Sequence, residues 1–374
     1  MARKRGKVDD YHSRVQELCS DAFELDHGHA QIALLQEAVQ IADAHGDAEL
    51  GYEVRHHLID AATFGGAPEV ALVAFAWCLA RSDEDPQRFD PDDLYWKYKW
   101  MATAAVKFPT ISQQQLTQLL EDMRQRYIAA GIGLHPFYQT RRSVYLTMGE
   151  IQAAWQDHEQ VLKLEPNWMS DCPACERDST VDVYLELGDY QQAVATAQPI
   201  FAGKMRCMEV PHRTYAKFLL SLLQRQETER ASAYHRQGLR LIRTQPAFIQ
   251  EAALHLLFLT LTNNLAAATR LAQRYLPLYL ACRCPLWRFE FSRVMAFVCQ
   301  RLAQSEPPLR LRLPEHFPLP EGVDRKDYSS LAMLFRTEAQ ELATAFDIRN
   351  GNDHYRKRFA QLDLWPQQIQ PLPM

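Results

Sequence analysis

Four residues have the types and the spacing of a metal site. Cys172 and Cys175 form a Cys-x-x-Cys segment, and Cys207 and His212 follow further along the chain. A Cys-x-x-Cys loop can place two thiolates on one edge of a zinc tetrahedron, and cysteine and histidine are the usual ligands of structural zinc. The four residues therefore predict a structural Cys₃His zinc site, with His212 or the Cys282-Arg-Cys284 segment as the source of the fourth ligand.

The same cysteines have two other interpretations. They could be ordinary thiols that happen to lie close together, or a redox-active dithiol. Redox motifs of this spacing normally lie at a strand-to-helix turn, and this sequence shows almost no strand pattern. Zinc is therefore the preferred interpretation, and the other two stay open.

A second group of residues suits the recognition of a partner. In residues 95–101 two tryptophans share one helical face, with tyrosines and lysines between them. Aromatic anchors are common in interfaces, and basic side chains nearby could receive an acidic peptide. Packing between helices, or a solvated helix face, explains such residues about as well. The candidate partner-binding residues are Trp96, Lys97, Trp100, Arg141, Tyr145 and Lys217.

The elements that must position these residues are helices. Apolar residues recur at three- and four-residue spacing in stretches of roughly 12 to 20 residues, separated by short turn signals. The pattern predicts an all-α chain of about fifteen helices. The alternating run Leu309–Leu313 is enclosed by prolines, and we expect an extended connector there.

A glycine followed five residues later by an alanine recurs along the chain. Glycine can end a helix with a positive φ, and a small residue one turn into the next helix lets two helices approach closely. Glutamine or asparagine replaces the glycine in two segments. The pairs are Gly28/Ala33, Gly66/Ala71, Gly149/Ala154, Gly188/Ala193, Gln226/Ala231 and Asn263/Ala268. The alanines are 37 to 39 residues apart, except for one double step of 83 that a degenerate repeat near residues 111–131 would fill.

Two segments carry a resemblance to a known repeat family. Gly149-Glu-Ile-Gln-Ala-Ala-Trp-Gln-Asp-His-Glu-Gln-Val-Leu-Lys-Leu-Glu-Pro166 resembles the second helix of a tetratricopeptide repeat, and residues 184–193 resemble the junction between its two helices. The resemblance covers about residues 10–304. More broadly, the chain resembles uncharacterised bacterial proteins of this repeat class. It implies a right-handed α-solenoid of helix-turn-helix units with a concave face, although the period here is longer than the usual 34 residues.

The ends of the chain differ from this array. Residues 305–324 contain many prolines and predict a non-helical connector. Residues 325–365 predict a helical cap over the last repeat, because an array needs its open end covered. We expect residues 1–9, which are basic, and residues 366–374 to be mobile.

Composition limits the possible functions. The 374 residues carry a formal charge of −5, which gives no bulk attraction for nucleic acid. The sequence has no long uncharged apolar run, we expect no secretory signal, and eight cysteines suit a reducing cytoplasm. Phosphate-binding loops, nucleophile elbows and helical zinc-protease motifs are also missing from the sequence.

The sequence therefore favours a non-enzymatic, cytoplasmic scaffold that binds a protein or peptide. One alternative is a regulatory or immunity-type subunit of a bacterial defence or toxin system, in which the solenoid holds an effector inactive. Another is a metal-dependent enzyme with an unrecognised helical site.

Overall fold

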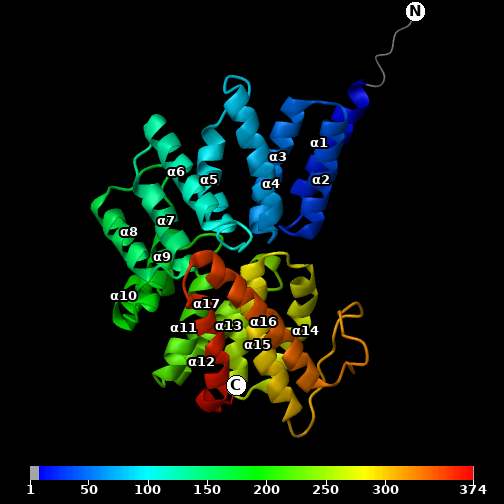
Figure 1. Cartoon of the computed structure of the whole chain (residues 1–374), viewed down its shortest axis with the longest axis vertical. Helices are drawn as coiled ribbons and strands as arrows, with labels where there is room; N and C mark the ends of the chain where they lie inside the picture. The colour runs from blue at the N-terminus through cyan, green and yellow to red at the C-terminus, as the bar shows by residue number, and fades with distance from the viewer. Residues whose placement is uncertain (1–7, 374) are drawn as a thin grey trace, which may run out of the picture. The chain divides into compact units, whose positions relative to one another are not determined.

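The computed structural model shows an all-α chain built from helix pairs (Figure 1). The structure describes residues 8–373, and in this range it has 17 α-helices, no strands and 73% helix. The predicted all-α repeat fold is thus confirmed. Of the basic N-terminal segment, residues 1–7 lie outside the described range. No described helix is both long enough and apolar enough to cross a lipid bilayer.

The chain forms two compact units, which divide after Ala105. In the first unit, α1 packs on α2 and α3 on α4, and α5 adds to α4. The prediction of one array over residues 10–304 did not include this division. The helices of the first unit are α1 (Val8–Phe23), α2 (His29–Ala44), α3 (Ala48–Phe64), α4 (Pro68–Glu84) and α5 (Asp92–Ala105).

The second unit begins at Val106 and contains the predicted metal ligands. Its successive pairs are α7 with α8, α9 with α10, α11 with α12 and α13 with α14. Its helices are α6 (Gln113–Ala129), α7 (His135–Met148), α8 (Ile151–Lys163), α9 (Pro173–Glu186), α10 (Tyr190–Phe201), α11 (His212–Gln224), α12 (Thr228–Ile242), α13 (Ile249–Leu261), α14 (Leu265–Ala281), α15 (Pro285–Ala303), α16 (Tyr328–Asn350) and α17 (His354–Leu364).

The predicted turn residues and small contact residues are present in five of the six segments. Each of these five turns has a residue with positive φ, and the alanine that follows is completely buried. These pairs are Gly66/Ala71, Gly149/Ala154, Gly188/Ala193, Gln226/Ala231 and Asn263/Ala268. The Gly28/Ala33 pair is wrong, because Gly28 has extended backbone at φ 164° and Ala33 is exposed. The spacing therefore located the pairs α3–α4, α7–α8, α9–α10, α11–α12 and α13–α14, but missed the α1–α2 pair.

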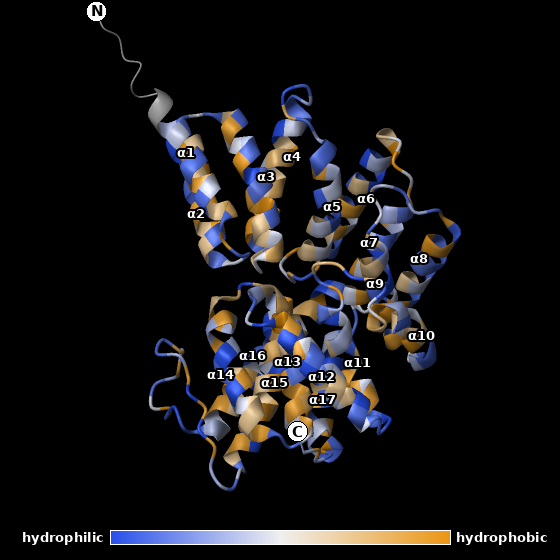
Figure 2. Ribbon diagram, turned by 180° about the vertical axis from the view of Figure 1, so that it is seen from behind, coloured by the Kyte–Doolittle hydropathy of each residue, from blue (hydrophilic) through white to orange (hydrophobic). Residues whose placement is uncertain are grey.

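Two helices form the centre of the second unit. Ten of the thirteen residues of α13 and fourteen of the nineteen residues of α15 are buried. A helix that is buried on most of its sides must be surrounded by other elements. α13 contacts α11, α14 and α15, and α16 packs along α15. Figure 2 shows α13 and α15 coloured by hydropathy.

The C-terminal helices do more than cap the last pair, as was predicted for residues 325–365. After the non-helical connector, in which residues 309–313 form no strand, α16 covers α15. The start of α17 and the turn before it also reach the end of α7: the Tyr355 hydroxyl donates to the Thr147 carbonyl (2.7 Å), and the Asn352 amide donates to the Met148 carbonyl (2.8 Å). In addition, the Arg349 guanidinium donates to the Val106 carbonyl (2.8 Å). These contacts tie the C-terminal helices to the beginning of the second unit.

The tail that was predicted to be mobile is held on the same unit. The backbone N–H groups of Gln370 and Leu372 donate to the carbonyls of Leu261 and Thr262, at 2.8 and 3.0 Å. The Asn264 amide donates to the Leu372 carbonyl (2.8 Å). Backbone carbonyls at the end of α13 thus hold the tail, and Ile369 and Leu372 pack against the apolar core.

A buried histidine pair between α12 and α13 gives a testable pH dependence. The Nδ1 atoms of His235 and His255 lie 3.1 Å apart, so one ring donates and the other accepts. Burial lowers the pKa of His235 to about 4, assisted by the positive charge of Arg236, and burial lowers the pKa of His255 well below its usual value. Below about pH 6.5 the unfolded chain takes up protons that the folded chain does not.

Stability is therefore expected to fall as the pH is lowered from about 6.5 toward 4, with a slope of about 1.4 kcal/mol per pH unit from each histidine. Urea unfolding at about pH 7 and about pH 5 measures this dependence. His255→Leu should reduce the difference between the two pH values. An unchanged difference in this variant would contradict the assignment to this pair.

Candidate metal centre

Two loops of the second unit carry the candidate ligands. Residues 164–172 connect α8 to α9, and residues 202–211 connect α10 to α11. Cys172 is the N-cap of α9, and its sulfur accepts a hydrogen bond from the Cys175 backbone N–H (3.4 Å). Pro173 follows at the first helical position, where a missing N–H costs nothing. The Cys-x-x-Cys segment therefore folds as the first turn of a helix.

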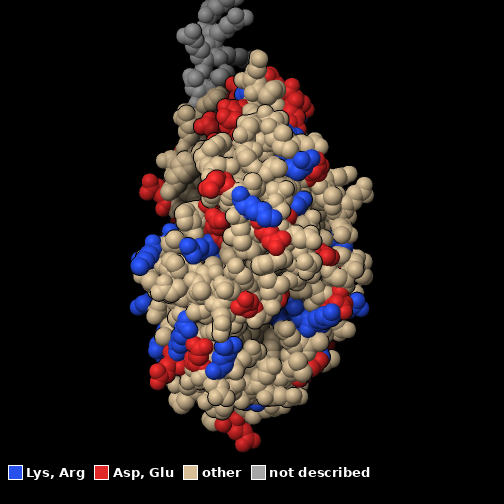
Figure 3. Space-filling view, turned by 90° about the vertical axis from the view of Figure 1, so that its left-hand side faces the viewer, with Lys and Arg blue, Asp and Glu red and all other residues tan. Residues whose placement is uncertain are grey.

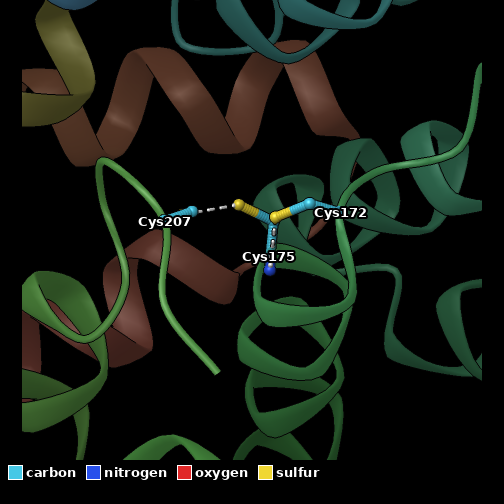
Figure 4. A group of neighbouring side chains, drawn as sticks. All are labelled: Cys172, Cys175 and Cys207. Carbon is cyan, nitrogen blue, oxygen red and sulfur yellow. Dashed lines mark hydrogen bonds between the residues drawn. The ribbon is translucent and has the colours of Figure 1, made fainter. Parts of the chain in front are cut away.

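The structure brings three of the four predicted ligands together. The sulfur atoms of Cys172, Cys175 and Cys207 all lie within 4.8 Å of one another, and those of Cys175 and Cys207 are 3.1 Å apart. Figure 4 shows Cys172 and Cys175 at the start of α9 and Cys207 approaching from the other loop. A hydrogen bond from the Cys207 N–H to the Val210 carbonyl (3.0 Å) folds that loop back on itself. We call these three residues the thiol cluster.

Hydrogen bonding within the thiol cluster shifts the pKa values of Cys175 and Cys207 in opposite directions. The hydrogen bond between the Cys175 and Cys207 sulfurs lowers the pKa of Cys207 to about 6, and the backbone N–H groups of Glu209 and Val210 add to this effect. The same hydrogen bond, together with burial, raises the pKa of Cys175. One proton thus lies between the two sulfurs, and a metal ion that binds both would displace it.

The predicted fourth ligand lies elsewhere. The His212 ring stacks on Phe248, with ring centroids 5.4 Å apart and planes 2° from parallel, and its nitrogens are not part of the thiol cluster. Burial lowers the pKa of His212, and its Nδ1 atom is buried without a hydrogen-bond partner. The alternative residues Cys282 and Cys284 are buried in the large apolar core of the second unit. The structure therefore does not bring His212 to the three sulfurs, because its ring packs against Phe248 instead.

The donor set determines which metals fit. Three thiolates at this spacing suit soft or borderline ions such as Zn²⁺ and Cu⁺, and do not suit Mg²⁺ or Ca²⁺, which prefer oxygen. Cys172 is exposed and the other two cysteines are half-buried, so an ion can reach the cluster from solvent. Among the described residues the group contains three ligands, which leaves a further coordination position to be filled from elsewhere.

The candidate partner-binding residues of the first unit are engaged within that unit. Lys97 is buried, forms an ion pair with Asp60 and donates to the His56 carbonyl (3.1 Å). The Trp96 ring lies under the Lys99 ammonium group, 3.6 Å from the ring centroid. The remaining candidate there, Trp100, packs edge-on against Phe64 at 5.2 Å.

The basic candidates of the second unit are also paired. Arg141 forms two hydrogen bonds to the Asp157 carboxylate, at 2.8 and 2.6 Å, and its guanidinium lies 5.5 Å from the Tyr145 ring. Lys217 contacts the carboxylates of Asp178 and Asp182, both at 2.7 Å. Each of these cations thus has a carboxylate partner on another helix or on a neighbouring pair, and their contact with an acidic peptide stays a prediction.

The sequence analysis missed a set of exposed apolar side chains beside the thiol cluster. Trp168 is 71% exposed and lies in the loop that ends at Cys172, and Met208 is 60% exposed and follows Cys207 directly. Leu162 and Leu164, at the end of α8, are exposed as well. A large apolar residue in a loop next to a Pro-Asn turn is the signal that could have found Trp168. We call Leu162, Leu164, Trp168 and Met208 the apolar loop residues.

Charged side chains form no comparable group on the face that Figure 3 shows. On the face shown in Figure 3, basic and acidic side chains are mixed, with broad uncharged areas between them. Exposed large apolar side chains in neighbouring loops are thus a more specific feature than charge. No protein-family model and no curated protein sequence matches the chain.

Proposed function

We propose that the chain is a non-enzymatic scaffold of tetratricopeptide type that binds a protein or peptide, and that zinc at the thiol cluster stabilises its binding edge. The proposal rests on one observation: the two loops that carry the three sulfurs also carry the exposed side chains of Trp168 and Met208. Exposed aromatic side chains are frequent anchors in interfaces. Repeat spacing and five buried turn alanines support the tetratricopeptide class, with a right-handed array.

In this proposal zinc has a structural role. A single ion bound by Cys172, Cys175 and Cys207 would hold the α8–α9 and α10–α11 loops together, and so fix the positions of the apolar loop residues. All eight cysteines are free thiols, as expected for a reducing compartment such as the cytoplasm. The zinc would then order a binding surface on two neighbouring helix pairs.

Site-specific photo-crosslinking tests the binding role. A photoreactive amino acid at position 168, introduced into the protein in cells of its source organism, should give a discrete adduct with one protein or peptide. The same amino acid at position 348 is a matched control, because Ile348 is 78% exposed and belongs to α16, not to either loop. Met208→Asp should weaken the adduct at position 168. Equal labelling at both positions, or no adduct at 168, would argue against this edge as the binding surface.

A metal-dependent enzyme is the second candidate, and one observation favours it. The thiol cluster supplies three protein ligands, and catalytic zinc sites keep three protein ligands and one open position. Cobalt substitution distinguishes the two roles, because the visible spectrum of Co²⁺ reports its ligands. Azide should leave the spectrum of a closed structural site unchanged, whereas a shifted spectrum would favour an open catalytic position.

A further inference from the structure

The thiol cluster contains an odd number of thiols in unequal environments. Cys172 is exposed at the N-cap of α9, with a backbone N–H directed at its sulfur. Reactive cysteines are frequently found at helix N-termini and in Cys-x-x-Cys segments. Cys175 and Cys207 are half-buried, and their sulfurs are in contact at 3.1 Å. One thiol can therefore meet a reagent from solvent, while the other two are placed to react with each other.

We propose that the thiol cluster is a site of oxidation by hydroperoxides, in which Cys172 reacts first and the final product is a Cys175–Cys207 disulfide between the two loops. This inference goes beyond the scaffold function. It uses the same three sulfurs as the zinc site but does not depend on zinc being bound. The metal-bound and disulfide forms exclude each other, because a disulfide removes two of the three thiolate ligands.

The reaction proceeds in three balanced steps. The Cys172 sulfur attacks a hydroperoxide oxygen and the O–O bond breaks, which yields a sulfenic acid on Cys172 and an alcohol or water. The Cys175 thiol then attacks the Cys172 sulfur, which forms a disulfide and releases water. Finally the Cys207 sulfur attacks Cys175, and Cys172 leaves as a thiol that takes up the proton lost by Cys207. Overall, two thiols are oxidised and one hydroperoxide is reduced.

The geometry favours the disulfide between the loops as the end point. Cys175 lies between the other two residues: its N–H contacts the Cys172 sulfur, and its sulfur contacts the Cys207 sulfur. A disulfide bond is about 2.05 Å long, so the Cys175 and Cys207 sulfurs need to approach by only about 1 Å. The loop from 202 to 211 carries Cys207, so a small shift of this loop supplies the approach.

Peptide mapping can distinguish the possible products, because trypsin separates the residues. Cleavage after Lys163, Arg177, Arg206 and Arg213 places Cys172 and Cys175 together in peptide 164–177 and Cys207 in peptide 207–213. The full chain is treated with a chelator and then with hydrogen peroxide, alkylated, digested and analysed by mass spectrometry. We expect the two peptides to be linked, with the alkyl group on Cys172. A disulfide confined to peptide 164–177, or full alkylation of all three residues, would overturn the proposal.

Two variants test the order of the steps. Cys207→Ser should accumulate the Cys172–Cys175 disulfide within peptide 164–177, because the last exchange cannot occur. Cys172→Ser should form the link between the peptides on the order of tenfold more slowly. Cys19→Ser, which changes a half-buried thiol in the first unit, should behave like the unmodified chain. A link formed by Cys172→Ser at the unmodified rate would exclude Cys172 as the entry point, whatever the zinc content of the protein.

Discussion

Replacing Cys172 with serine is expected to destabilise the zinc-loaded protein while leaving the zinc-free protein unchanged or slightly more stable. Cys172 is exposed and is the N-cap of α9, accepting a hydrogen bond from the Cys175 N–H. Serine is a preferred N-cap residue, so the substitution keeps this hydrogen bond and improves the acceptor. Any loss of stability must then come from the missing metal ligand.

The expected size of the effect follows from linkage. If free zinc is at about one hundred times its dissociation constant, binding to the folded state contributes about 2.7 kcal/mol to the free energy of unfolding. Cys172→Ser should lose most of this contribution, and its zinc content should fall from about one equivalent to near zero. Thermal unfolding with zinc and with a chelator, together with elemental analysis, measures both quantities.

The chelator arm decides between metal binding and ordinary packing. Cys19→Ser serves as the control, because Cys19 lies on α1 in the other unit. An equal loss of stability for Cys172→Ser with and without the chelator would mean that the thiol itself contributes the stability. Wild-type protein that contains no zinc and does not respond to a chelator would remove the structural metal from the proposed function.

The clustering of the three sulfurs could be predicted because their position depends on repeat spacing. Cys175 lies in the first turn of α9, and Cys207 lies in the loop before α11. These two helices are equivalent members of adjacent pairs, so a regular array places both cysteines on the same edge. His212 has the same position along the array, but its ring packs against Phe248, which is 36 residues away. A ring orientation set by a distant contact has no local signal in the sequence.

The basic residues show the same limit. Lys217 stands 39 and 35 residues from its partners Asp178 and Asp182, and Arg141 is 16 residues from Asp157. Helical pairing rules identify partners three or four residues away and give no information on partners across helices. Prediction of the fold was more successful, since amphipathic periodicity and turn glycines are local signals. The division after Ala105 and the return of α16 and α17 to α7 depend on long-range packing.

Gly149 and Gly188 make this difference between local and long-range signals measurable. Both end the first helix of a pair, both have a buried alanine five residues later, and their φ angles are +80° and +75°. Their surroundings differ. A Cβ atom on Gly188 would meet nothing within 4 Å, whereas one on Gly149 would lie 2.4 Å from both Cβ and Cγ of His354. His354 begins α17, so this contact belongs to the attachment of the C-terminal helices to α7.

Gly188→Ala is therefore expected to lower the free energy of unfolding by about 1–2 kcal/mol, the cost of a left-handed backbone for a residue with a Cβ atom. Gly149→Ala should lose about 1–3 kcal/mol more, because the clash involves the base of the His354 side chain and cannot be relieved by a rotamer change. Denaturant unfolding of both variants measures the two costs. On a His354→Gly background the extra cost at position 149 should disappear, since no side chain remains to be displaced. Equal losses of stability for the two alanine variants would show that α17 does not pack against the α7–α8 turn. This contact would then not attach the C-terminal helices to α7.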